Sequence, residues 1–185
     1  TAAAIRSKEL ARRIATEPAD STPFDIEPGL LDPREAIRAL DSTIPKDWDI
    51  VGGSGHQAAW LAQLRGRPAE RFTTVREFGA VGNGLSYALG VAAARRQGRD
   101  GKLVLIEGDG GLLFHIQELE TVRRHGMRML ICVMNDGGYG SEFHKLRADG
   151  IDDSQAIFGR PAFENIARGF GLRGHEIRDV SIIPK

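Results

Sequence analysis

The segment Lys102-Leu-Val-Leu-Ile-Glu-Gly-Asp-Gly-Gly111 decides how this chain is interpreted. Its first part, residues 102–107, is a nearly continuous apolar run, which is typical of a strand buried on both faces of a sheet. Glycines follow at once, with Asp109 among them, and residues 112–125 then carry apolar side chains at helical spacing. The segment therefore predicts a strand, a tight turn and a helix, which is the repeating unit of α/β proteins.

The same alternation continues on both sides of this segment. We expect further strands at 48–51, 72–75, 129–134 (buried) and 172–177, and helices at 56–65, at 83–97 and from Pro161 to about 170. This order predicts an α/β fold with a doubly wound, mainly parallel sheet and helices on both faces. The polar, glycine-containing stretch 137–160 is expected to be a mobile loop.

The first 47 residues differ in composition from the rest. They hold five of the eight prolines and one glycine. We expect a helix over 2–16 that stops before Pro18, a surface linker over 17–31, and a helix from the N-cap Asp32 to about Leu40. Residues 1–47 are thus predicted to be a connector arm, and residues 48–185 the functional domain.

Composition excludes several classes of function. The formal net charge is zero, which argues against a nucleic acid or an anionic membrane held by bulk charge. The single cysteine, Cys132, excludes an internal disulfide framework and a zinc site built on several thiolates; mid-strand, it is expected to be an inert buried thiol. No apolar run approaches the roughly 18 residues that span a bilayer, and we expect a cytoplasmic protein without a secretory signal.

The unusual feature is the glycine content, 23 of 185 residues. Four clusters follow strand candidates, at 52–55, 79–84, 108–111 and 137–140. Each alone could be a tight turn, because glycine is the default turn residue. Four clusters at one end of a parallel sheet instead expose backbone N–H groups and helix N-termini where ligands bind, and this predicts a phosphate site.

Acidic residues accompany two of these clusters. Asp109 follows one strand and Asn135-Asp136 ends the next, so adjacent parallel strands would bring their oxygens together as ligands for Mg²⁺. The alternative is that Asp109 only caps its helix and Asn135-Asp136 only makes a turn. A dinucleotide fingerprint fails, because Leu113 stands where a third glycine or alanine is needed, and no Walker loop occurs. The histidines outside the glycine clusters are expected to be surface or structural residues: His115, His125, His144 and His175.

Taken together, these motifs resemble the thiamine diphosphate signature. Gly108-Asp109-Gly110 precedes Asn135-Asp136, and Asn135 lies 27 residues after Gly108. Gly55-His56-Gln57-Ala58-Ala59-Trp60 is similar to a segment of the acetolactate synthase and 2-oxo acid decarboxylase branch, and residues 79–85 match its aminopyrimidine-cradling stretch. The resemblance covers about 48–180, the diphosphate-binding domain.

The resemblance implies roles for individual residues. Asp109, Asp136 and the Gly138 carbonyl would bind Mg²⁺. The Gly79 carbonyl would accept from the cofactor's 4′-amino group, and Val81 would be the apolar wedge that bends the cofactor. The diphosphate and the surrounding turn would be held by Ser54, Gly55, His56, Gly110, Gly111 and Tyr139.

Two alternatives stay open among these roles. His56 could contact the diphosphate or only begin a helix. The family usually has Asn where Asp136 stands, and a register shifted by one residue would make Asn135 the ligand. The extra carboxylate should tighten metal binding.

The resemblance also implies a function. The intact protein would be a thiamine-diphosphate-dependent lyase or transferase that decarboxylates or joins 2-oxo acids. The catalytic glutamate would come from a pyrimidine-binding domain or subunit, in a homodimer or tetramer, so the isolated chain is expected to be inactive. The alternative is a non-catalytic domain of the same fold that serves in assembly or binds another phosphorylated ligand.

Overall fold

A computed structural model describes residues 7–18, 20–74, 77–95 and 102–183. Its sheet consists of β1 (Asp49–Gly52), β2 (Phe72–Thr74), β3 (Leu103–Gly108) and β4 (Leu130–Met134). All described strand pairs are parallel, and the strand order is β2-β1-β3-β4. The chain therefore leaves β1 in one direction to β2 and returns past β1 to β3, so the predicted doubly wound parallel sheet is confirmed.

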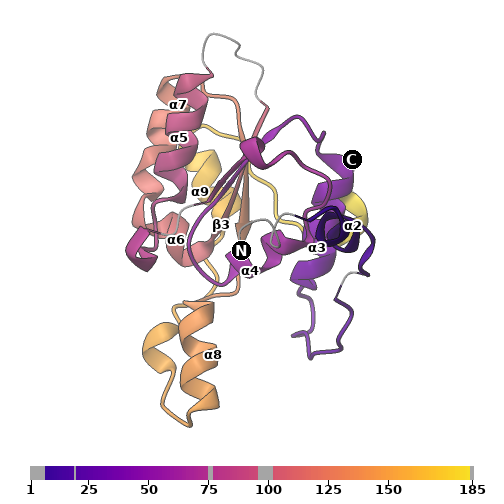
Figure 1. Cartoon of the computed structure of the whole chain (residues 1–185). Helices are drawn as coiled ribbons and strands as arrows, with labels where there is room; N and C mark the ends of the chain where they lie inside the picture. Colours follow the sequence, from indigo (N-terminus) through magenta and orange to yellow (C-terminus); the bar gives the residue numbers. More distant parts are fainter. Residues whose placement is uncertain (1–6, 19, 75–76, 96–101, 184–185) are drawn as a thin grey trace.

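Helices connect and flank these strands. The α-helices are α2 (Lys8–Thr16), α3 (Pro33–Thr43), α4 (Gln57–Trp60), α5 (Gly84–Ala94), α6 (Asp109–Phe114), α7 (Leu119–Arg124), α8 (Gly140–Ala148) and α9 (Phe163–Gly169). Figure 1 shows α5, α6 and α7 on one side of the sheet and α3 on the other. Short 3₁₀ turns occupy Leu61–Gln63, Ala69–Arg71, Glu77–Gly79, Ile116–Glu118, Ser154–Ala156 and Val180–Ile182. Within the described ranges, none of these helices has the length and apolar character needed to cross a bilayer.

Helix caps follow the sequence signals. The Asp32 side chain accepts a hydrogen bond from the Arg34 amide, and Pro33 occupies the first helical position of α3. The Ser7 hydroxyl accepts from the Leu10 amide at the start of α2. The first residues of the helix predicted over 2–16, and the last residues of the helix predicted over 83–97, lie outside the described residues.

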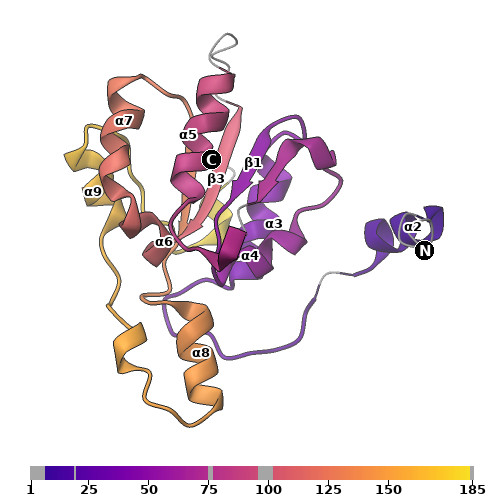
Figure 2. The same ribbon diagram turned by 60° about the vertical axis from the view of Figure 1, so that its left-hand side comes forward.

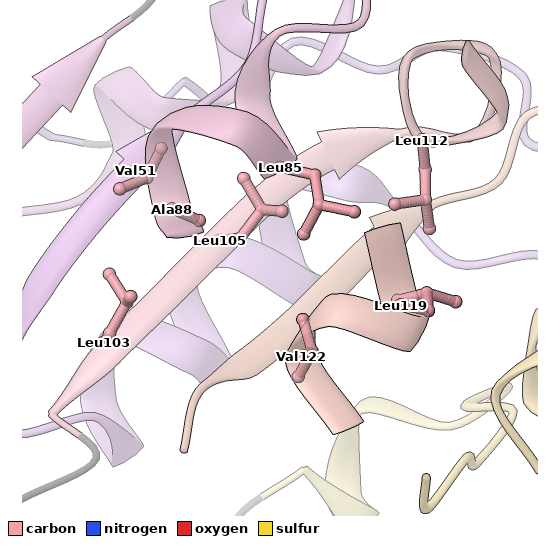
Figure 3. Close-up of a cluster of buried hydrophobic side chains, with 8 residues drawn as sticks. All are labelled: Val51, Leu85, Ala88, Leu103, Leu105, Leu112, Leu119 and Val122. Atoms are coloured by element: carbon pink, nitrogen blue, oxygen red, sulfur yellow. The ribbon is translucent and has the colours of Figure 1, made fainter. Parts of the chain in front are cut away.

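Apolar side chains cover both faces of the sheet, as the near-continuous strand runs predict. Leu103 and Leu105 of β3 point to one face, where they pack with residues of α5, α6 and α7 (Figure 3). Val104 and Ile106 point to the opposite face, which α3 and the segment after α4 cover. This alternation follows from the two-residue period of a strand. Helices on both faces are therefore confirmed.

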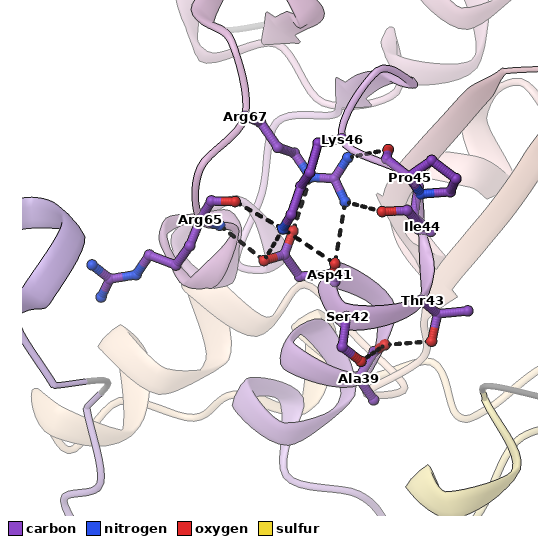
Figure 4. A network of polar contacts seen from close by, with 9 residues as sticks. All are labelled: Ala39, Asp41, Ser42, Thr43, Ile44, Pro45, Lys46, Arg65 and Arg67. Carbon is purple, nitrogen blue, oxygen red and sulfur yellow. Dashed lines mark hydrogen bonds and ion pairs between the residues drawn. The ribbon is translucent and has the colours of Figure 1, made fainter.

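A polar network ties α3 to the segment that follows α4 (Figure 4). The Asp41 carboxylate accepts from Arg67 Nε at 2.9 Å and from the Arg65 amide at 3.0 Å, and lies 2.8 Å from Lys46 Nζ. The fully buried Arg67 side chain also donates to the Ile44 and Pro45 carbonyls. Arg67 thus pairs with backbone carbonyls at the end of α3, and the network joins α3 to the segment that follows α4.

Residues 137–160 do not form the predicted loop. They contain α8 and the Ser154–Ala156 turn, and the Tyr139 amide donates to the Ala156 carbonyl at 2.8 Å. Phe143 of α8 and Ala156 of the Ser154–Ala156 turn are both buried, and the helix and the turn pack against each other. The segment therefore has a small apolar core of its own. The sequence interpretation was wrong here because it weighed polarity and glycines above these two apolar positions.

The predicted strand 172–177 is absent from the described structure. Leu172 packs against the α7 side of the core, and the Gly174 carbonyl accepts from Arg168. Downstream, Arg178 donates to the Gly29 carbonyl in the arm. Consequently β4 is an edge strand of the described sheet, and Leu130 is 42% exposed, although the sequence predicted a buried strand.

The helix predicted over 112–125 is also divided. α6 begins earlier, at Asp109, and ends at Phe114, because the next residue, His115, has a φ of −129°, outside the helical region. A 3₁₀ turn and α7 complete the stretch.

The arm runs from α2, which stands apart from the sheet, along an extended segment into α3 (Figure 2). Arg34 lies over the Phe24 ring at 4.5 Å, and Phe24 stacks on Trp60 with ring centroids 6.5 Å apart. Arg160 pairs with Glu27 at 2.7 Å. The linker thus lies on the surface of the domain, while the boundary at residue 47 stays a prediction.

The central strand should dominate stability. Leu105 is fully buried in β3, and replacing it with alanine would leave a cavity between the sheet and α5. We expect Leu105→Ala to lower the free energy of unfolding by about 3 kcal/mol in urea denaturation. Leu130→Ala on the exposed edge strand is the matched control and should cost about 1 kcal/mol or less; equal losses would contradict the described strand order.

Candidate functional site

The glycine clusters gather where the sheet's strands end. β1 ends at Gly52 and β3 at Gly108, each the first residue of a cluster, and β4 ends at Met134, shortly before the cluster at 137–140. The fourth cluster precedes α5, which packs on β1 and β3. Gly55 and Gly137 have φ values of 145° and 86°, which favour glycine. These turns therefore lie at the carboxyl ends of the strands, where the strand order β2-β1-β3-β4 places a switch point between β1 and β3.

Asp109 links two of these turns. Its side chain is buried, with Oδ1 accepting from the Gly110 amide and Oδ2 from the Gly137 amide, each at 2.7 Å. Burial and the neighbouring Asp136 carboxylate raise the pKa of Asp109 to about 6. The structure thus brings Asp109 and Asp136 together above adjacent strands, as expected from the parallel sheet. Their proximity concentrates negative charge there.

Asp136 also faces a histidine. Its Oδ2 lies 3.6 Å from His56 Nδ1, and the His56 ring lies 5.0 Å from that of His144. His56 stands at the start of α4 but makes no capping hydrogen bond with its side chain. Burial and the charge of His56 lower the pKa of His144. His144 is exposed on α8, in line with the expected surface residue, and α8 brings its ring close to His56.

Asn135 is engaged elsewhere. Its Nδ2 donates to the Pro161 carbonyl at 3.0 Å, which directs the side chain toward the start of α9. Of the two neighbouring residues, Asp136 therefore faces Asp109. A methyl group at Gly140 would collide with both Asp136 and His56, so the first residue of α8 has to be small.

A hollow lies beside Gly110, the residue that follows Asp109. It has a volume of about 200 Å³ and is lined by Gly110, Leu113, Phe114 and Tyr139. The Tyr139 ring lies 5.4 Å from Phe158 and 6.3 Å from Phe114. Val81 is 36% exposed, and a methyl group at the neighbouring Gly82 would meet Phe114. The site therefore combines an acidic, amide-rich part with an apolar, aromatic part.

The sequence interpretation missed Glu107. This residue is fully buried, and its Oε1 accepts from Gln57 Nε2 at 3.0 Å and from the Gly108 amide at 3.2 Å. Burial raises its pKa to about 7, an effect that the Gly108 and Gly84 amides partly oppose. A charged residue at the end of an otherwise apolar buried strand was the available signal.

The donor set fits Mg²⁺ and a diphosphate. In the part of the chain that the structure describes, no group of three or more His, Cys, Asp or Glu side chains gathers as a metal site. Two carboxylates stand together, however, and Mg²⁺ commonly takes one or two carboxylates, with phosphate oxygens and water completing its octahedron. Burial and then the Asp136 carboxylate raise the pKa of Asp109, and a cation between the two carboxylates would neutralise their charge.

Burial also raises the pKa of Cys132 to about 12, in line with the expected inert thiol.

Residues 53–183 match the family described as "Thiamine pyrophosphate enzyme, C-terminal TPP binding domain". The chain belongs to this family. Thiamine pyrophosphate and thiamine diphosphate are the same cofactor. This match confirms the resemblance to thiamine diphosphate enzymes that the glycine clusters and the Gly-Asp-Gly motif indicate.

Curated relatives include acetolactate synthase large subunits. That of Parasynechococcus marenigrum is 29% identical over 173 residues, covering 89% of this chain and 27% of the relative. The isozyme 2 large subunit of Escherichia coli is 28% identical over 145 residues, covering 76% of this chain and 26% of the relative. The chain therefore spans about a quarter of the length of these relatives.

Solved structures share the fold. A thiamine diphosphate-dependent 4-hydroxybenzoylformate decarboxylase of Rhodococcus jostii superposes with a TM-score of 0.74 at 20% identity, covering 89% of this chain and 31% of that one. Benzoylformate decarboxylase of Polynucleobacter necessarius gives 0.75 at 15% identity, covering 90% and 31%.

The two raised pKa values predict an unusual pH dependence. Unfolded carboxyl groups titrate near pH 4, whereas Asp109 and Glu107 keep their protons to about pH 6 and 7 in the fold. The native state binds more protons in this interval, so stability should fall as pH rises from about 4.5 to 7.5. Thermal unfolding of the metal-free chain in a chelator should show this decline, with a shallower slope in Asp109→Asn. A midpoint that rises over the interval would contradict the assignment.

Proposed function

We propose that this chain binds thiamine diphosphate through Mg²⁺ and serves as the cofactor domain of an enzyme that acts on 2-oxo acids. The observation that carries the proposal is the buried Asp109. Its carboxylate accepts hydrogen bonds from amides of two neighbouring turns and lies beside Asp136. Folding alone gives no reason to place two carboxylates together, because like charges repel in a poorly solvated site. A bound cation removes that repulsion.

Individual residues would divide the work. Asp109, Asp136 and the Gly138 carbonyl would hold Mg²⁺. The Gly79 carbonyl would accept from the 4′-amino group, and Val81 would support the bend of the cofactor from the apolar side. Contacts to the diphosphate and the adjoining part of the cofactor would come from Ser54, Gly55, His56, Gly110, Gly111 and Tyr139. When bound, the cofactor supplies a carbon nucleophile and an electron sink.

The whole enzyme needs more than this chain. A pyrimidine-binding domain or partner subunit would supply the catalytic glutamate, so the chain alone would be inactive. We place residues 1–47 as the arm that connects to such a domain and 48–185 as the cofactor domain, within a homodimer or tetramer. The relatives' names support a lyase or transferase of the acetolactate synthase or decarboxylase type. The cytoplasmic location stays a prediction.

Metal-dependent stabilisation tests the cofactor proposal. Thiamine diphosphate and Mg²⁺ together, at about 100 times the dissociation constant, should stabilise the fold by about 2.7 kcal/mol and raise the unfolding midpoint by roughly 5–10 °C. Either Asp109→Ala or Asp136→Ala should abolish the shift, because each removes a metal ligand.

Asp149→Asn, at the exposed end of α8, is the matched control and should retain the full shift. A shift that persists in both Asp109→Ala and Asp136→Ala, or one that needs no metal, would contradict the proposed site. A mere loss of stability in Asp109→Ala is separated from loss of binding by comparing each variant with and without ligand.

The first residue of α8, Gly140, should also affect cofactor binding. Gly140→Ala would push a methyl group between Asp136 and His56, so we expect cofactor affinity to fall at least about tenfold in a fluorescence titration, a loss of about 1.4 kcal/mol. Gly90→Ala is the control, since a methyl group at this position of α5 meets open space. It should leave affinity unchanged and stabilise the helix by about 0.5–1 kcal/mol. Equal affinities in the two variants would contradict the described packing.

A further inference from the structure

We propose that Glu107 is a positioning residue whose buried side chain holds three glycine turns at the spacing that the cofactor site requires. The purpose of that spacing rests on the proposed function. The packing role itself depends only on residues of the described fold, so the two can be tested separately.

Glu107 continues a row of buried side chains on one face of β3. Leu103 and Leu105 precede it at two-residue intervals, and α5 covers the row. At the end of the row the carboxylate takes the place of another aliphatic side chain. It is as deeply buried as Leu105, with 0% of the residue exposed.

Three glycines surround this carboxylate. A Cβ atom added at Gly53, Gly84 or Gly111 would collide with the Glu107 side chain in each case. These glycines belong to the turn after β1, the first residue of α5 and the first turn of α6. The side chain therefore fills the point at which three segments, distant in sequence, approach one another.

Hydrogen bonds extend this arrangement to a fourth segment. Gln57, buried in α4, donates to Glu107 Oε1, and the added Cβ of either Gly55 or Gly108 would lie against the Gln57 side chain. Gln57 directly follows His56, whose ring faces Asp136. Contacts thus run from Glu107 through Gln57 to the turn proposed to hold the diphosphate.

The chemistry of the residue indicates a role beyond filling space. Glu107 Oε2 is buried without a hydrogen bond of ordinary geometry among the described residues. Burying an incompletely paired carboxyl group destabilises a fold, and apolar replacements of buried charged groups are often neutral or stabilising. A residue that only packed would serve better as Met or Leu. Specific polar contacts to the surrounding turns are what an apolar side chain would lose.

The glycines have an alternative explanation. They could lack side chains because the cofactor approaches their backbone closely, in which case Glu107 would be incidental. The two explanations differ in what happens when Glu107 is shortened. If Glu107 is the neighbour that excludes a side chain, a shorter residue at 107 should make an alanine at position 53 acceptable.

The first experiment measures local opening in the cofactor-free chain. Amide hydrogen exchange followed by NMR should become about tenfold faster in the turns around 53–57, 82–84 and 108–111 in Glu107→Met, without a lower unfolding midpoint. Glu107→Gln, which keeps the Oε1 acceptor, should lie closer to the original protein. Ile106→Val, on the opposite face of β3, should lower the midpoint without selective opening. Unchanged exchange in Glu107→Met, or a uniform increase across the domain, would overturn the proposal.

The second experiment is a double-variant cycle. Gly53→Ala should lower the unfolding midpoint by about 5 °C because it overpacks the site, and most of this loss should vanish in a Glu107→Ala background. An equal loss in both backgrounds would overturn the proposal. Cofactor affinity is measured alongside and should fall about tenfold in Glu107→Met. If the turns loosen but the unaltered chain binds no cofactor with Mg²⁺, the proposed function fails while the positioning of the turns stands.

Discussion

The site depends first on the two amide hydrogen bonds to Asp109. One comes from its own turn, and the other comes from Gly137 in the turn after the next strand. Because a buried carboxylate without partners is costly, these bonds hold the ends of β3 and β4 in one arrangement. Asp136 then lies beside Asp109 as a consequence of chain geometry, and α8 begins close enough to bring His144 to His56. A single side chain thus fixes the relation of two turns.

The glycine content has a more specific cause than flexibility. Gly53, Gly84 and Gly111 lack side chains where the Glu107 carboxylate lies, and Gly140 lacks one where Asp136 and His56 meet. In each case an atom of the protein already occupies the position of the missing Cβ. The glycines therefore leave room between turns for polar side chains, with Glu107 buried and Asp136 and His56 partly exposed, in addition to leaving backbone amides accessible to a phosphate.

How far the sequence could predict this structure varied with the range of the interactions involved. The strands were placed to within one or two residues, because the apolar run around Leu105 reports burial directly. The prediction failed for segments whose conformation depends on contacts with residues distant in sequence. Residues 137–160 fold because Phe143 and Ala156 meet, and 172–177 is drawn toward α9 instead of pairing with β4. Glu107 was missed for the same reason, since its three glycine neighbours become visible only in space.

The pairing of Asp109 with Asp136 contrasts with the position of the neighbouring Asn135. An amide would place an uncharged oxygen beside Asp109, but Asn135 is turned toward Pro161 and the carboxylate of Asp136 takes the position instead. In the absence of a cation this choice raises the pKa of Asp109 and opposes folding at neutral pH. The same charges attract a divalent cation more strongly than one carboxylate and one amide could. Two adjacent carboxylates are therefore an arrangement that the proposed Mg²⁺ ion would stabilise.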